Sequence, residues 1–335
     1  MVSKIILLNW NGRAQLQRFL PSVVAAAPVG VGIVVADNGS TDDSVAYLKR
    51  EFPTVERICL DRNYGFAEGY NRALAQVEAD NFILLNTDVE TPCGWIEPLL
   101  ETLERHPETA AVAPKLHAIA DRTRFEYAGA SGGFIDFLGY PFCRGRILQT
   151  IEQDNGQYEQ EREVFWVSGA AFCCRAKVFR QLGGFDADFF AHMEEIDLCW
   201  RMQIAGYTLR IVPQSCVYHV GGGTLATGSP QKVFLNHRNN LAMLYKCASI
   251  PQRLTVSVVR PLLDLATAAS YLFQGRGDCC RAVFRAWYEF LCWHPALQRK
   301  RKEIKSSQQA VAKGIYRGSI ILRHLAGRHT FDKMM

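Results

Sequence analysis

An asparagine and an aspartate, two positions apart, directly follow a short apolar run in this sequence. The run, Phe82–Leu85, is too short for a helix but long enough for a buried strand. Side chains two apart on an extended chain point to the same side, so Asn86 and Asp88 could together hold a hard divalent cation that carries a diphosphate. The alternative is that these residues only shape the turn before Thr91–Gly94.

Three carboxylates lie within one helical turn at Glu194, Glu195 and Asp197. A carboxylate can act as a general base that removes a proton from an attacking hydroxyl group. The same pattern also suits the first turn of a helix, where the helix dipole favours negative charge, and Asp197 with Arg201 has the spacing of an i,i+4 ion pair. Both interpretations remain open from the residues alone.

His219 precedes three glycines, Gly221–Gly223, which permit a close approach of the backbone to another group. A histidine in this position can contact a diphosphate, or it can serve only the fold. The glycines slightly favour the first interpretation.

Short apolar runs alternate with helical patterns through the first 116 residues. We expect strands at 4–8, 31–36, 55–60, 82–85 and 110–116, with helices between them. This alternation predicts an α/β fold with a mixed, mostly parallel sheet and helices on both faces. Polar residues follow the first four strands, namely Asn11, Asp37, Asn63 with Asn71, and Asp88.

Polar residues that follow neighbouring strands of a parallel sheet lie at the same edge and line one crevice there. Each cluster alone is explained by turn chemistry, but four in succession favour a nucleotide-binding cleft. The turn after the first strand lacks G-x-G-x-x-G, and the chain has no G-x-x-x-x-G-K-[ST], so the sequence argues against a dinucleotide oxidoreductase and a P-loop protein.

Composition limits the alternatives further. The chain has 335 residues, 48% of them hydrophobic, and a net charge of +5, which is typical of a globular protein and does not imply nucleic acid as a partner. None of its 11 cysteines forms a C-x-x-C motif, which argues against a zinc site. Most have apolar neighbours, so we expect core cysteines in a reducing compartment. No signal peptide is visible. Acidic residues concentrate before about position 200 and basic residues after 230.

Two later regions give weaker signals. From 121 to about 161 the pattern is lost and glycines recur, which predicts an insertion or a mobile loop over the site. Residues 254–273 are apolar but interrupted by Arg260, Pro261 and Asp264, so we do not expect a spanning helix. Residues 278–291 predict an amphipathic helix that either packs on the protein or lies in a membrane interface, with 299–302 at the headgroups.

Taken in order, four motifs resemble those of family 2 inverting glycosyltransferases of the GT-A fold. The likeness is greatest to rhamnosyltransferase-type bacterial members that build cell-surface polysaccharide, and it covers roughly residues 3–245. The resemblance implies a GT-A domain over 1–245, and the amphipathic pattern and basic run beyond it predict a helical, basic, membrane-interface region over 246–335. The motifs are Asp37–Asp42, Asn63–Asn71, Asn86–Asp88, and Glu194–Asp197 with His219.

The resemblance also implies roles for individual residues. Asp37 would bind the nucleotide base, and Asp88 would hold Mg²⁺ or Mn²⁺, with His219 near the diphosphate or on the metal. Glu195 matches the family's catalytic carboxylate, which is often Asp, and leaves Asp197 and Glu194 as alternatives. Asn86 replaces the first aspartate of the family's D-x-D. The remaining residues expected at the nucleotide are Asn9, Asn11, Asn63, Asn71 and Asn86.

The expected reaction moves a sugar, with rhamnose as a candidate, from a nucleoside-diphosphate donor to a hydroxyl of a glycan or lipid-linked glycan. The expected location is the inner face of the plasma membrane. One alternative is a sugar-phosphate nucleotidylyltransferase, for which Asn11-Gly12-Arg13 is a poor phosphate loop. Another is a non-catalytic, membrane-bound nucleotide-sugar-binding scaffold, which Glu195 in place of Asp keeps open.

Overall fold

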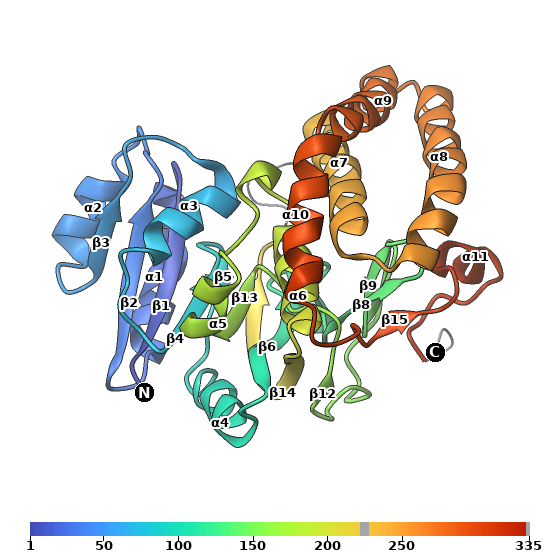
Figure 1. Cartoon of the computed structure of the whole chain (residues 1–335). Helices are drawn as coiled ribbons and strands as arrows, with labels where there is room; N and C mark the ends of the chain where they lie inside the picture. The colour runs from blue at the N-terminus through green and yellow to red at the C-terminus, as the bar shows by residue number, and fades with distance from the viewer. Residues whose placement is uncertain (222–227, 333–335) are drawn as a thin grey trace.

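The computed structural model describes residues 1–221 and 228–332 (Figure 1). Two of the three glycines after His219, Gly222 and Gly223, lie outside the described residues. The first half of the chain confirms the predicted alternation of strands and helices. It contains β1 (Ser3–Asn9), α1 (Arg13–Ala26), β2 (Val31–Asp37), α2 (Ser44–Glu51), β3 (Glu56–Cys59), α3 (Gly65–Leu74) and β4 (Asn81–Leu85).

The four strands β4, β1, β2 and β3 lie side by side in that order and are all parallel. Successive side chains of a strand point to opposite faces, and β1 shows the consequence. Ile5 and Leu7 pack with Leu16 of α1 in one apolar cluster, whereas Ile6 packs with Tyr70 of α3 in another. Helices therefore cover both faces, as predicted, and all four strands present their carboxyl ends at one edge.

The sheet continues beyond β4 with both strand directions. β13 (Ala171–Arg175) runs antiparallel between β4 and β6 (Thr109–Ala118), and β14 (Thr208–His219) is parallel to β6. The short β5 (Val89–Glu90) pairs with the end of β14, so that Val89 faces His219. The remaining elements of this part are α4 (Glu97–Arg105), β7 (Asp121–Phe125), β12 (Arg162–Glu163), α5 (Ala176–Gln181), a 3₁₀ turn (Ala187–Phe189) and α6 (Glu194–Ile204).

The expectation of a mobile loop from 121 to 161 is wrong. The region forms a second, small sheet whose apolar side chains, such as Phe142, are buried. Gly139 and Gly145, with φ of 89° and 95°, make the tight turns between its strands. The strands are too short to show a periodic pattern. They are β8 (Gly133–Asp136), β9 (Pro141–Cys143), β10 (Arg146–Ile147) and β11 (Thr150–Ile151), joined by β15 (Ile315–Tyr316) from near the C-terminus.

The C-terminal third is helical, as predicted, with α7 (Pro230–Cys247), α8 (Ile250–Phe273), α9 (Gly277–Cys292), α10 (His294–Ser306) and α11 (Ile320–Leu325). In Figure 1, α7, α9 and α10 lie above the sheet, and α8 stands at the outer edge. The apolar side of α9 is divided between two environments. Val283 is buried and Phe290 packs against the main core, whereas Phe284 and Leu291 remain exposed.

The basic residues at 299–302 also have two kinds of surroundings. Lys300 forms ion pairs with Asp186 and Asp188, and Arg301 donates hydrogen bonds to three carbonyls at the end of α7. These two residues fix α10 to the protein, which leaves the exposed Arg299 and Lys302 for the headgroup role that the sequence suggested for the whole run.

Candidate active site

The carboxyl ends of β1 and β2 carry the first part of the site. Asn9 donates from Nδ2 to Asp37 Oδ1 at 2.9 Å, and Ser40 N donates to Asp37 Oδ2 at 2.9 Å. Both side chains are buried, and Asn9 Oδ1 is enclosed without a hydrogen-bond partner. An unpartnered buried amide oxygen is costly in a folded protein, so this oxygen is a candidate to accept from a ligand.

Asn11 and Asn63 lie nearby and shape the loops. Asn11 has φ of 48° and accepts at Oδ1 from the backbone N of Thr41 at 2.7 Å. Asn63 accepts from the side chain of Asn38, which is itself buried, and from the backbone N of Gly65. These contacts hold the residues after β2 and β3 in place at the crevice.

Asn71 does not join this group. Its side-chain amide pairs with the backbone of Phe185, with Nδ2 donating to the carbonyl and Oδ1 accepting from the amide, both at 2.9 Å. Gly184 is required beside it, since a Cβ there would lie 2.4 Å from Asn71 Oδ1. Asn71 thus fixes the segment before the 3₁₀ turn to α3, and both polar atoms of its amide are engaged in doing so.

Asp88 and His219, both expected at a metal ion, are brought together. His219 Nε2 lies 3.2 Å from Asp88 Oδ1, and His219 Nδ1 lies 3.2 Å from Glu126 Oε2. Burial disfavours a charged imidazole, but the bonds to the two carboxylates outweigh it and raise the pKa of His219 to about 10. Gly221 closes the group, because a Cβ there would lie 2.7 Å from Glu126 Oε1.

These residues fit a divalent cation held jointly by protein and substrate. Among the described residues, no cluster of three or more His, Cys, Asp or Glu could enclose a metal ion by itself. One carboxylate and one imidazole, Asp88 and His219, supply two ligands of the kinds that Mn²⁺ and Mg²⁺ accept, and diphosphate oxygens can supply others. Asn86, which is partly buried, lies two residues before Asp88, and its backbone N donates to the carbonyl of Ala170 at 2.9 Å.

The carboxylates of α6 follow a turn of unusual conformation. Phe190, His192 and Met193 have positive φ of 64°, 69° and 70°, a region that non-glycine residues rarely adopt. Asn239 of α7 holds this turn, because its Nδ2 donates to the carbonyls of residues 189, 191 and 192 at 2.8–3.0 Å. The backbone N of Phe66, at the start of α3, donates to the carbonyl of Phe190 at 2.7 Å. Strain that is held by several contacts in this way is characteristic of functional sites.

Glu195 is partly buried, and its Oε2 is enclosed without a hydrogen-bond partner. Burial raises its pKa to about 7, although the backbone amides of Glu195 and Ile196 partly offset that effect. Burial and the neighbouring Glu195 raise the pKa of Glu194 well above its usual value. Of these two carboxyl groups, Glu195 is therefore the one that can exchange a proton near neutral pH.

Gly169 and Ala170 connect Glu195 to the residues around Asp88. A Cβ on Gly169 would lie 3.6 Å from Glu195 Cγ, and Ala170 accepts the backbone hydrogen bond of Asn86. Burial raises the pKa of Cys143, and the carboxylates of Glu126 and Glu195 both add to this effect. The segment Gly169–Ala170 therefore lies against Glu195 on one side and binds Asn86, two residues before Asp88, on the other.

Asp197, one of the alternatives for the base, is fully buried in an ion network. Arg201 Nε donates to its Oδ2 at 2.8 Å, and Lys246 Nζ lies 2.8 Å from its Oδ1. Lys246 also pairs with Asp186. A carboxylate so enclosed cannot reach a substrate, so the structure removes Asp197 from the candidates and assigns it to the contact between α6 and α7.

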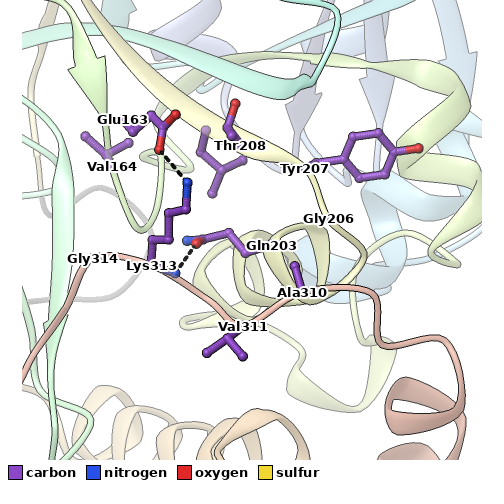
Figure 2. Close-up of a pocket in the computed structure, with 11 residues that line it drawn as sticks. Glu163, Val164, Gln203, Gly206, Tyr207, Thr208, Ala310, Val311, Lys313 and Gly314 are labelled. Atoms are coloured by element: carbon purple, nitrogen blue, oxygen red, sulfur yellow. Dashed lines mark hydrogen bonds and ion pairs between the residues drawn. The ribbon is translucent and has the colours of Figure 1, made fainter.

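A cavity of about 190 Å³ lies elsewhere, between the end of α6 and residues 310–314 (Figure 2). Lys313 pairs with Glu163 across it, and the backbone N of Lys313 donates to Gln203 Oε1 at 2.8 Å. None of the candidate site residues lines this cavity.

Sequence reasoning missed Glu126 and Asn239. Glu126 falls in the region whose pattern was unreadable, so nothing in the sequence connected it with His219. Asn239 stands in a run of polar residues, Asn236–Asn240, that opens a helical pattern. The one signal that could have found it was the helical spacing, which puts Asn239 on the side of the helix that faces the protein.

The fold is a mixed α/β sheet that carries polar side chains at the carboxyl ends of its parallel strands, with the carboxylates of α6 nearby. The sequence profile described as glycosyl transferase family 2 matches residues 4–183, and that of glycosyl transferase family group 2 matches residues 146–272. The chain therefore belongs to glycosyl transferase family 2.

A similar curated protein is the N-acetylglucosaminyl-diphospho-decaprenol L-rhamnosyltransferase of Mycobacterium tuberculosis. It is 30% identical over 233 residues, which cover 65% of this chain and 76% of that protein. The expected family, and the likeness to rhamnosyltransferases of bacteria, are confirmed.

Two solved structures show the same architecture. GalNAc-T7 with UDP, GalNAc and Mn²⁺ superposes with a TM-score of 0.62 at 16% identity, covering 78% of this chain and 50% of that chain. The mannosyltransferase PcManGT of Pyrobaculum calidifontis, in complex with GDP-Man and Mn²⁺, gives 0.53 at 13% identity, covering 91% and 84%. The expected GT-A fold is thereby confirmed.

Proposed function

We propose that this glycosyltransferase is a metal-dependent, inverting enzyme that uses Glu195 as its base. The observation that carries the proposal is the junction at Gly169–Ala170. Gly169 lies against Glu195, whose pKa is raised to about 7, and Ala170 accepts the backbone hydrogen bond of Asn86, two residues before Asp88, which supports a base near the proposed metal ligands.

The donor is a nucleoside-diphosphate sugar, with UDP or dTDP as the favoured nucleotide. Asp37 and Asn9 are the proposed base-binding residues, since Asn9 carries the enclosed, unpartnered oxygen. Asn11 and Asn63 support this pocket by holding its loops. For Asn71 we propose a structural role, because its amide is used by Phe185. The UDP and GDP-Man in similar solved structures support a nucleotide at this edge of the sheet.

The proposed metal ligands are Asp88 and His219. A bound Mg²⁺ or Mn²⁺ would neutralise charge on the leaving diphosphate. Because His219 must be deprotonated to bind a metal, Glu126, 3.2 Å from Nδ1, would accept the remaining ring proton and orient the ring. Asn86 stands beside them as a neutral oxygen donor in place of the first family aspartate.

In the transfer step Glu195 removes the proton from the acceptor hydroxyl. The hydroxyl oxygen forms a bond to the anomeric carbon as the bond from that carbon to the diphosphate breaks, and the configuration inverts. The strained turn at 190–193 sets the position of Glu195, and the enclosure of its Oε2 limits water around the proton acceptor.

The proposed acceptor is a hydroxyl of a glycan or lipid-linked glycan, and the proposed sugar is rhamnose. The name of the mycobacterial relative supports both. With such an acceptor, the protein would work at the inner surface of the plasma membrane. We also propose the division into a catalytic part, 1–245, and a membrane-facing helical part, 246–335, which the charge distribution supports.

The test combines nucleotide binding with turnover. We expect UDP or dTDP to raise the melting temperature only with Mn²⁺ or Mg²⁺, because ligands that bind the folded state stabilise it. Asp88→Ala should abolish the metal-dependent rise in melting temperature. The control Glu90→Gln, two residues away at a side chain paired with Arg122, should keep it. Equal metal-dependent stabilisation in Asp88→Ala would refute the metal role.

Turnover separates the alternatives. Donor hydrolysis, or transfer to an acceptor, supports the proposal. Pyrophosphate release from a nucleoside triphosphate and a sugar phosphate would instead indicate a nucleotidylyltransferase. Nucleotide binding without hydrolysis or transfer would indicate a scaffold.

A further inference from the structure

The helix α8 turns its polar residues inward and its apolar residues outward. Gln252, Val256, Arg260, Asp264 and Ala268 form a buried row at steps of four. The opposite row is exposed, with Leu254, Val258 and Leu262 each about two-thirds accessible to solvent. We call this exposed row the α8 face, and it consists of Ile250, Leu254, Val258, Leu262, Leu265, Leu272 and Phe273.

Polar contacts lock α8 in this orientation. Arg260 Nη1 donates to the carbonyl of Leu138 at 3.0 Å and to Asn240 Oδ1 at 2.6 Å. Arg260 also pairs with Asp264, whose Oδ2 accepts from Trp287 Nε1 at 3.0 Å. Turning the α8 face inward would remove both charged groups from these partners, which is strongly unfavourable.

Hydrogen bonds through Phe137 also connect the start of α8 to the segment that precedes α11. Gln252 Nε2 donates to the carbonyl of Phe137, and the backbone N of Phe137 donates to the carbonyl of Gly318, just before α11. Figure 1 shows α11 beside the lower end of α8, and α11 carries two further exposed apolar side chains, Leu322 and Leu325. An apolar surface of this extent on a folded protein indicates an interaction site.

Charge identifies the partner. Residues 246–335 hold sixteen Lys and Arg against five Asp and Glu, a formal charge of +11, whereas residues 1–245 carry −6. A second copy of this chain would bring a second region of +11 to the α8 face, and the two would repel. An anionic phospholipid surface has the opposite charge and accepts apolar side chains between its headgroups.

We propose that α8 lies in the plane of an anionic phospholipid bilayer, with the α8 face inserted at the interface. This inference rests on the proposed function through the lipid-linked acceptor, which such a position would present to the active site. Among the described residues, α8 is the one helix long and apolar enough to cross a membrane by length and composition. By length and composition, the expectation that residues 254–273 do not qualify as a spanning helix is therefore wrong.

Spanning is nevertheless disfavoured by the contacts of α8. Arg260 and Asp264 lie near its middle, where a spanning helix would place them in hydrocarbon. In the plane of the interface they keep their present partners, and only the α8 face meets lipid. The arrangement therefore needs no rearrangement of the fold.

The test is sedimentation of the full-length protein with vesicles of phosphatidylglycerol and phosphatidylcholine. We expect the wild type to bind these vesicles, and the double variant Leu254→Glu, Leu262→Glu to bind at least about tenfold more weakly. Both leucines are exposed, so the melting temperature should not change. The matched control, Val2→Glu with Val29→Glu, makes the same change at exposed valines of the N-terminal part and should bind like the wild type.

Three outcomes would overturn the inference. The first is a wild type that is found only in the supernatant, and the second is equal vesicle binding by the two double variants. A wild-type dimer that Leu254→Glu, Leu262→Glu converts to a monomer, without vesicle binding, would identify a second copy as the partner. Metal-dependent UDP or dTDP stabilisation, measured on the same samples without vesicles, reports the proposed function separately, so either idea can fail alone.

Discussion

Asn239→Asp is the substitution that tests most directly how the fold positions the proposed base. Asn239 is fully buried, and its Nδ2 faces the carbonyls of residues 189, 191 and 192. Aspartate has the same size and keeps the acceptor oxygen that Arg238 Nε uses at 3.0 Å. It replaces the donor group by an oxygen that cannot donate when ionised.

The magnitude follows from the turn that Asn239 holds. The three residues with positive φ, Phe190, His192 and Met193, each cost about 1 kcal/mol, or about 3 kcal/mol together. The two N–H protons of Asn239 return about 1 kcal/mol each. Their loss removes about 2 kcal/mol, a large part of what offsets the strain, so we expect the turn to relax and Glu195 to move.

The expected result is a fall in kcat of about a hundredfold, the effect of displacing a catalytic group by about 1 Å. The donor KM should stay nearly constant, because Asp37, Asp88 and His219 lie on other elements. The assay is steady-state transfer or donor hydrolysis, measured below the melting temperature of the variant. Asn236→Asp, the same change at a partly exposed site on the same helix, serves as the control.

A variant Asn239→Asp that folds and keeps the wild-type kcat would refute this reasoning. It would mean that the contacts of α3 and the core alone hold the turn. A fall in stability with no loss of kcat would likewise assign Asn239 a purely structural role.

Further predictions concern the ionisable groups around α6. Since a base acts when deprotonated and the pKa of Glu195 is raised to about 7, kcat/KM should rise about tenfold per pH unit below 7 and level off above it. Glu195→Gln should lower kcat by at least about a hundredfold and abolish the rise of kcat/KM with pH below 7. A variant that keeps this pH dependence would show that another group is the base. Lys246→Met should destabilise the protein by about 3 kcal/mol, because it leaves Asp197 and Asp186 with one cationic partner each; an unchanged urea midpoint would contradict the importance of this network.

The sequence by itself determined the sheet and its functional edge. Apolar runs such as Phe82–Leu85 are short, fully buried and followed by polar residues, and the parallel direction of neighbouring strands follows from the helices between them. Local pattern was sufficient here, because strand, helix and turn residues each show their preference within a few positions. The nearness of Asp88 to His219, which are far apart in sequence, came from the resemblance and not from spacing.

Tertiary structure alone decided the roles of the acidic residues. The sequence paired Asp197 with Arg201, one helical turn away, but it did not show that Lys246 also meets Asp197 or that Glu195 keeps an enclosed, unpartnered oxygen. Lys246 comes from another helix and lies 49 positions after Asp197 in the sequence. No local pattern contains that information, because the pKa of a side chain depends on burial and on charges brought near it by folding.

The same distinction holds for the surface of α8. The sequence showed Arg260, Pro261 and Asp264 interrupting an apolar segment, and this predicted that the segment is not a spanning helix. The fold gives Arg260 and Asp264 partners within the protein and turns the leucines outward, so the interruption fixes which face is exposed. Composition sets how polar a helix is, but only packing against neighbouring elements decides which of its sides meets the solvent.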